Sequence, residues 1–173
     1  FLRPAEISGD RSTDFDFIVH ALDWLASEGQ EPDYLVHIRP TTPLRDPVLI
    51  DAAVKAFRAS TRATALRSVH EMSESAYKTF ELDEGGQLKR LGAVNTDLDS
   101  ANNARQQFPN TYQANGYVDV LSSVFIRESG LMHGDHVMPF ITPSVIEVDT
   151  LDDFAHLEFQ ISRMPGVLLK LFT

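Results

Sequence analysis

The chain has 173 residues, 25 Asp and Glu against 15 Lys and Arg, a formal net charge of -10 and no cysteine. This length is typical of one domain with its own core, so we expect residues 1–173 to form a single domain. The lack of cysteine excludes a disulfide framework, a thiolate metal site and a thiol nucleophile. The acidic balance argues against nucleic acid as a partner. Neither a membrane-spanning run nor a secretory signal is visible, so we expect no membrane partner and a cytoplasmic protein.

Strand and helix patterns alternate through the first half of the chain. A helix is expected after the polar segment 10–14 and a buried strand over 34–38. Asp46 predicts the cap of a second helix, with Pro47 in its first position, and 63–69 is the next strand candidate. This alternation is typical of an α/β sheet with mostly parallel strands.

The middle of the chain departs from that alternation. Two strand patterns, 77–82 and 87–91, flank Asp83-Glu84-Gly85-Gly86, which is a strong hairpin signal. A polar, Asn-rich segment follows. We therefore expect residues 72–110 to form an excursion from the main sheet.

Strand-to-helix order returns towards the end. The patterns predict a long strand over 117–126, a short helical turn or loop over 128–134 and a further strand over 145–149. Thr150 and Asp153 have the spacing of a capping box at the start of a final helix.

Two segments follow strands and could carry chemistry, because ligands of open α/β sheets bind beyond the carboxyl ends of the strands. The loop Arg39–Arg45 offers two guanidinium groups and two threonine hydroxyls before a helix, and it fits either an anion site or a rigid turn. Glu147 and Asp149 would share one face of a strand. They could hold Mg²⁺, or be a solvated acid beside a helix cap.

Two weaker signals lie between these segments. Asn115-Gly116 allows a tight turn, or is only the loop before a strand. His133 and His136 have a spacing compatible with a metal, but no convincing helical frame surrounds them and further ligands are missing.

Taken together, motifs along the chain resemble the acylneuraminate cytidylyltransferases, which are the CMP-sialic acid synthetases and their relatives. The residues that carry the resemblance are Arg3-Pro4-Ala5-Glu6-Ile7 with Asp10, Pro40-Thr41-Thr42-Pro43-Leu44-Arg45, Arg105-Gln106-Gln107 with Asn115-Gly116, and Glu147-Val148-Asp149-Thr150 with Asp153-Phe154. The resemblance covers nearly the whole chain.

The resemblance implies a Rossmann-like α/β nucleotidyltransferase fold and a homodimer built through the excursion. It implies a reaction in which CTP and the anomeric hydroxyl of a nonulosonic acid give a CMP-sugar and pyrophosphate, with Mg²⁺ as the cofactor. Catalysis would then depend on positioning and charge neutralisation rather than on a covalent intermediate.

The resemblance also assigns roles to individual residues. Glu147 and Asp149 would be the catalytic, metal-holding carboxylates, with Glu147 standing where the family more often has Asp. Arg3 and Asp14 would lie on the nucleotide side, Asp14 in the place of a family serine. The sugar-binding positions would be Arg39, Lys78, Arg105, Asn115 and Asp119, with Lys78 and Arg105 reaching the acidic sugar of the partner subunit.

Three departures from the family pattern bear on substrate and completeness. Arg39 replaces a glutamine and Asp119 stands where sialic acid enzymes often have a tyrosine, which suggests a nonulosonic acid other than N-acetylneuraminate. The Gly-rich basic loop that cradles the CTP phosphates has no counterpart here, so we expect the chain to be N-terminally incomplete. Another keto-acid sugar nucleotidyltransferase, or a binding or dimerisation module without chemistry, remain alternatives.

Overall fold

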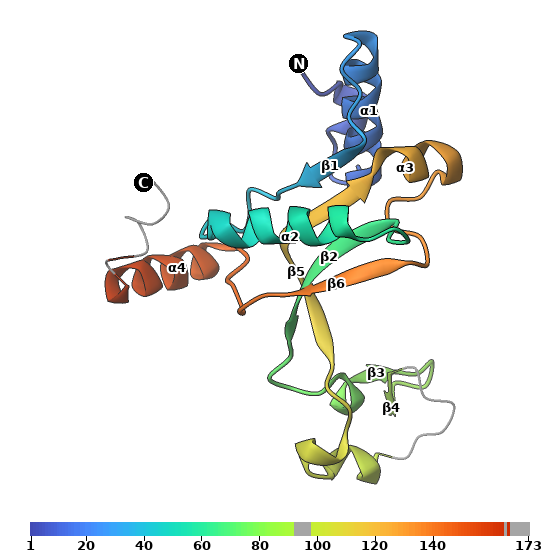
Figure 1. Ribbon diagram of the computed structural model, residues 1–173. Coiled ribbons are helices and arrows are strands. Elements are labelled where there is room, and N and C mark those ends of the chain that lie inside the picture. Colours follow the sequence, from blue (N-terminus) through green and yellow to red (C-terminus); the bar gives the residue numbers. More distant parts are fainter. Residues whose placement is uncertain (92–97, 165, 167–173) are drawn as a thin grey trace.

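The computed structural model describes residues 1–91, 98–164 and 166 (Figure 1). The α-helices are α1 (Asp14–Ser27), α2 (Pro47–Ala59), α3 (Ser123–Ser129) and α4 (Leu151–Arg163). The strands are β1 (Tyr34–His37), β2 (Ala65–Glu71), β3 (Phe80–Leu82), β4 (Leu88–Arg90), β5 (Tyr112–Ser122) and β6 (Val137–Ile141). The short 3₁₀ turns are η1 (Ala5–Ile7), η2 (Ala76–Lys78), η3 (Asp99–Asn102) and η4 (Arg105–Gln107). Among the described residues, no helix is long and apolar enough to cross a membrane.

The fold is α/β, and the strands of its main sheet pair in a mixed pattern, partly parallel and partly antiparallel. Its strand order is β1-β5-β2-β6. Strand β5 runs antiparallel to both of its neighbours, β1 and β2, and β2 pairs in parallel with β6. Of the three strand pairs in this sheet, β2–β6 is parallel and the two pairs that β5 makes are antiparallel, so the expectation of a mostly parallel sheet is not confirmed.

Helices cover both faces of this sheet. Successive residues of a strand point to opposite faces, and neighbouring residues of β2 accordingly enter different cores. Ala65 packs with residues of α1 and α3, whereas Leu66 packs with Ala53 of α2. The result is a sheet between two helical layers, as an α/β fold requires.

A bulge interrupts β5 where it pairs with β2. Arg67 is opposite Asp119 and Val69 is opposite Ala114, so residues 115–118 of β5 face Ser68 alone. Gly116 has a φ of 60° inside this bulge, a conformation that glycine adopts without a Cβ clash. The Ser68 hydroxyl accepts the Val118 N–H at 2.9 Å and so replaces a ladder acceptor. Bulges of this kind often redirect side chains near active sites.

The excursion contains the predicted hairpin, and its segments lie at the far end of β2 and β5 (Figure 1). Strands β3 and β4 are shorter than the sequence patterns suggested, and Leu82 pairs with Leu88 across them. The Asp83 carboxylate accepts the Gly85 and Gln87 N–H groups and closes the turn. Of the Asn-rich segment, residues 92–97 lie outside the described part of the chain.

Local capping signals were confirmed. The Asp46 side chain accepts the Val48 N–H at 2.9 Å ahead of α2, with Pro47 in the first turn. Thr150 and Asp153 form the expected reciprocal capping box of α4.

Three expectations were wrong. Residues 145–149 form no strand, because no neighbouring strand pairs with them. Strand β6, which pairs in parallel with β2, was not expected from the sequence. The strand expected over 117–126 begins earlier, at Tyr112, and ends at Ser122, whose side chain caps α3.

Candidate functional site

Three segments far apart in the sequence meet around Gly116. A Cβ on Gly116 would lie 3.2 Å from Thr42 Oγ1, 3.3 Å from Glu147 Oε1 and 3.4 Å from Arg39 Cδ. The Thr41 hydroxyl donates to Glu147 Oε1 at 3.3 Å, and the Thr41 carbonyl accepts the Val148 N–H at 2.7 Å. The proline-threonine loop, the bulge of β5 and the segment before α4 therefore form one contiguous place.

Arg39 lies at the end of β1 between two carboxylates, Asp14 and Asp119. Its Nη2 is 2.5 Å from Asp14 Oδ2, at the start of α1, and its Nη1 is 3.2 Å from Asp119 Oδ2, on β5. We call these three residues the Arg39 cluster. Burial lowers the pKa of Arg39, but the two carboxylates outweigh it and hold the pKa above its ordinary value.

Asp119 is a buried charge, since only 1% of its side chain is exposed. Arg67 Nε and His133 Nε2 each lie 3.9 Å from it, beyond hydrogen-bond distance. Burial raises the pKa of Asp119, but its basic neighbours more than compensate, and the pKa lies below its ordinary value. The carboxylate is thus ionised, as a buried group with cationic neighbours should be.

Arg45, the second guanidinium of the loop, is committed to the backbone. It is buried and donates to the carbonyl of Tyr117 at 2.7 Å and that of Gly116 at 3.1 Å. It also donates to the carbonyl of Arg39. Arg45 therefore fixes the loop against the bulge, and of the two arginines Arg39 is the one with carboxylates within ion-pair distance.

Asn115 is also committed internally. It is buried, its amide nitrogen donates to Thr142 Oγ1 at 2.6 Å, and its amide oxygen accepts the Tyr117 N–H at 3.2 Å. Its side chain shapes the bulge, while its role as a sugar contact stays a prediction.

Glu147 and Asp149 are exposed and lie on an irregular segment, so the argument that strand alternation aligns them does not hold. Glu147 contacts the threonine loop, whereas the Asp149 backbone N–H donates to Asp153 at 3.2 Å. No group of three or more potential ligands occurs among the described residues. Two exposed carboxylates fit the mode in which Mg²⁺ keeps waters and takes its other ligands from substrate phosphates.

Arg3 lies on the α1 side of the same region. Its guanidinium carbon is 5.7 Å from the centre of the Phe17 ring, and its Nε donates to Ser8 Oγ at 3.0 Å. With Phe17 and Pro40 it lines a pocket of about 350 Å³. Arg3 is therefore next to the proline-threonine loop, and its role on the nucleotide side stays a prediction.

Lys78 and Arg105 lie on the excursion, away from the Arg39 cluster (Figure 1). Lys78 Nζ is 5.8 Å from the centre of the Phe108 ring. Arg105 pairs with Glu71 at 3.3 Å and donates to the Met72 carbonyl at 2.9 Å. Within one chain they do not join the other predicted site residues.

Arg67 and His133 were not assigned to this site from the sequence, whereas Thr42 was one of the two threonine hydroxyls of the expected anion loop. Thr42 is fully buried, and its hydroxyl has no hydrogen-bond partner among the described residues. Arg67 and His133 flank Asp119, and the described residues give His133 and His136 no metal cluster. The sequence signal for such a cluster was the presence of an Asp and an Arg within strand patterns that are otherwise mostly apolar.

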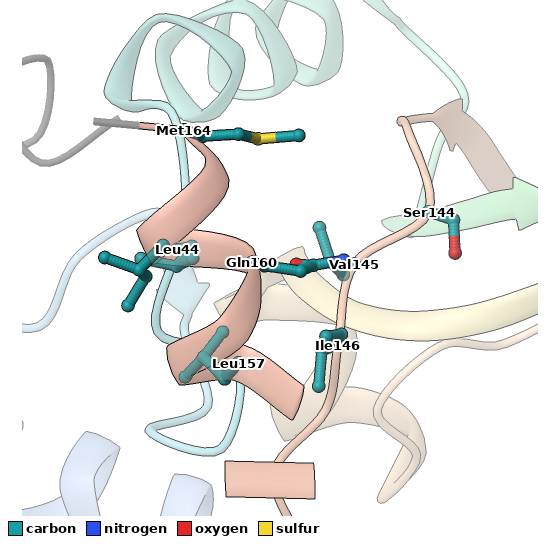
Figure 2. A pocket seen from close by; sticks show the side chains of 8 residues that line it. Leu44, Ser144, Val145, Ile146, Leu157, Gln160 and Met164 are labelled. Carbon is teal, nitrogen blue, oxygen red and sulfur yellow. The ribbon is translucent and has the colours of Figure 1, made fainter. Parts of the chain in front are cut away.

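An apolar pocket of about 190 Å³ lies beside this region, between α4 and the segment that precedes it. Figure 2 shows Leu157 and Met164 of the α4 region on one side, Val145 and Ile146 on the other, and Leu44 of the proline-threonine loop. Because residues of α4 and of the segment that contains Glu147 line the same pocket, the packing of α4 affects the position of that segment. No protein-family model matches the chain.

Proposed function

We propose that this chain is a Mg²⁺-dependent cytidylyltransferase of the acylneuraminate type, with a Rossmann-like nucleotidyltransferase fold. It joins CTP to the anomeric hydroxyl of a nonulosonic acid and releases pyrophosphate. The observation that carries the proposal is the convergence at Gly116 of Thr42, Glu147 and Arg39. Thr42, Gly116 and Glu147 belong to three of the motifs on which the resemblance rests.

In this proposal the two carboxylates and the loop position the reactants. Glu147 and Asp149 hold the metal, with Thr41 orienting Glu147 through its hydroxyl. When bound, Mg²⁺ supplies charge neutralisation on the triphosphate and lowers the pKa of the sugar hydroxyl. Arg3 and Asp14 lie on the nucleotide side, and Arg39, Asn115 and Asp119 form or shape the sugar pocket.

Lys78 and Arg105 would act across a homodimer. They lie on the excursion, whose surface carries several exposed apolar side chains: Tyr77, Phe80, Leu82, Leu88 and Leu91. Exposed apolar patches often mark protein interfaces. A second copy covering this surface would carry the two cations towards the partner subunit's sugar.

The test is pyrophosphate release from CTP and Mg²⁺ with a panel of N-acetylneuraminate, legionaminate, pseudaminate and an eight-carbon keto-acid sugar. Turnover with a nonulosonic acid other than N-acetylneuraminate is expected. Asp149→Asn should lower kcat/KM by about 100-fold or more, the scale of losing one transition-state contact. The matched control is Asp152→Asn, an exposed acid in the first turn of α4, which should leave kcat/KM unchanged.

Other outcomes separate the alternatives. Preference for N-acetylneuraminate would contradict the assigned substrate, and turnover with the eight-carbon sugar alone would identify a different keto-acid nucleotidyltransferase. If calorimetry detects no binding of CTP and Mg²⁺ and no turnover is measured, the results would favour a non-catalytic binding or dimerisation module.

A further inference from the structure

The guanidinium of Arg39 is shared between two carboxylates that are held very differently. Asp119 is buried in the middle of β5, with Arg67 and His133 as further basic neighbours. Asp14 lies at the first residue of α1, and 38% of its side chain is exposed. Asp119 therefore holds the Arg39 guanidinium from the buried side, and Asp14 is the carboxylate that can separate from it and become solvated.

Charge balance favours a ligand anion that replaces Asp14 over one that binds in addition to it. In the region around Asp119, Arg39 and Arg67 are matched by Asp14 and Asp119. A further anion would leave a net negative charge beside a buried carboxylate, which is unfavourable in a low-dielectric setting. An anion that takes the place of Asp14 keeps the balance.

The surroundings of Arg39 offer further contacts for such an anion. The buried Thr42 hydroxyl has no hydrogen-bond partner among the described residues, and it lies beside Gly116 together with Arg39 Cδ and the Glu147 carboxylate. The pocket of about 350 Å³ begins at Pro40, the residue after Arg39. A guanidinium fixed on its inner side by Asp119 presents its outer nitrogens in the planar arrangement that oxyanions prefer.

We propose that Asp14 is a built-in competitor for an anion site on Arg39, and that an anionic oxygen group of the substrate displaces it. This inference rests on the proposed function for the identity of that group, which is a sugar carboxylate or a nucleotide phosphate. Asp119 is then a positioning residue for Arg39 and does not itself contact the sugar.

The test follows the ¹⁵N–¹H signal of the Arg39 Nε group during titration with pyruvate, a 2-keto carboxylate, and separately with inorganic pyrophosphate. Asp14→Asn should lower the Kd for one of these probes by about fivefold, because a partly exposed ion pair contributes only modestly. The probe that shows the gain identifies a carboxylate or a phosphate as the ligand.

The matched control is Asp23→Asn. Asp23 belongs to the same helix and also pairs with an arginine, Arg127, at 2.5 Å, so its replacement changes the net charge equally. The Kd should remain that of the wild type. Arg39→Lys keeps a cation beside Asp119 but loses the planar fork, and it should weaken probe binding at least tenfold.

An unchanged or higher Kd in Asp14→Asn would overturn the inference, whatever the folding of Arg39→Lys. The measurement needs no turnover, so it is separate from the proposed function. Tighter probe binding by Asp14→Asn without pyrophosphate release from any sugar would support the anion site and contradict the cytidylyltransferase proposal. Turnover together with an unchanged Kd in Asp14→Asn would support the cytidylyltransferase proposal and contradict the anion site.

Discussion

Asp119 and Arg39 depend on each other because one of them is a buried charge. The Asp119 carboxylate has Arg39 at 3.2 Å, whereas its other basic neighbours, Arg67 and His133, lie at 3.9 Å. A buried carboxylate that loses its hydrogen-bonded partner is strongly destabilising. Arg39 and Asp119, which the resemblance assigned to one pocket, are thus in direct contact.

Arg39→Gln should therefore lower the free energy of unfolding by about 3 kcal/mol, because Asp119 is left with weaker partners. Urea denaturation measures this change. Arg127→Gln removes an arginine from partly exposed ion pairs with Asp23 and Glu31 and should cost no more than about 1 kcal/mol. Equal effects of the two substitutions would contradict the role assigned to Arg39.

Gly116 should be intolerant of a side chain for two separable reasons. Its φ of 60° is strained for any other residue, and a Cβ would crowd three neighbouring side chains. Gly116→Ala should cost about 3 kcal/mol, the sum of backbone strain and overpacking. Gly29, with a φ of 67° and no atom within 4 Å of a Cβ, isolates the strain, and Gly29→Ala should cost about 1 kcal/mol. Similar losses would show that the crowding at Gly116 is unimportant.

The sequence could identify residues of this site one by one but not their pairing. Arg39 and Asp119 were both assigned to a sugar pocket, yet their contact spans β1 and β5 and follows from sheet order. The same holds for Arg45 and Asn115, whose side chains bind the bulge. A local pattern shows that a polar residue is present, whereas its partner is set by tertiary structure.

At the scale of elements, the bulge of β5 depends on a side chain. Ser68 accepts the N–H of the buried Val118. Ser68→Ala leaves that donor without its acceptor and should cost about 2 kcal/mol in thermal or urea unfolding. Ser162→Ala removes an exposed hydroxyl that bonds within its own helix and should change stability by less than about 0.5 kcal/mol. A neutral Ser68→Ala would mean that the bulge has another acceptor for this group.

Elements with local signals could be predicted, and those that depend on pairing could not. The capping box at Thr150, the start of α2 and the turn of the hairpin are each specified within a few residues. Strand β6 contains Pro139, which argues against a central strand, but β6 pairs with β2 alone among the described strands, so it tolerates proline. The segment 145–149 alternates like a strand but pairs with none of the described strands.

At the scale of the molecule, the excursion is expected to make the dimer. Leu82 and Leu88 form a cross-strand pair and are 67% and 51% exposed. The double substitution Leu82→Asp with Leu88→Asp should convert a dimer into a monomer in sedimentation velocity, because charges cannot be buried there without partners. Leu151→Asp, at an 88% exposed position on α4, should leave the dimer intact. A double variant that still sediments as a dimer would place the interface elsewhere.

The connection of the excursion to the sheet has a mechanical consequence. Strand β1 pairs only with residues 119–122 of β5, and β6 pairs with β2 no further than Val69. Beyond the bulge, His70 and Glu71 face Gln113 and Tyr112 as a ribbon of two strands. Such a ribbon twists and bends at lower cost than a wider sheet. In a dimer joined through the excursions, bending at this neck would rotate one protomer relative to the other and change the distance between Lys78 and the partner's Arg39 cluster, with both cores intact.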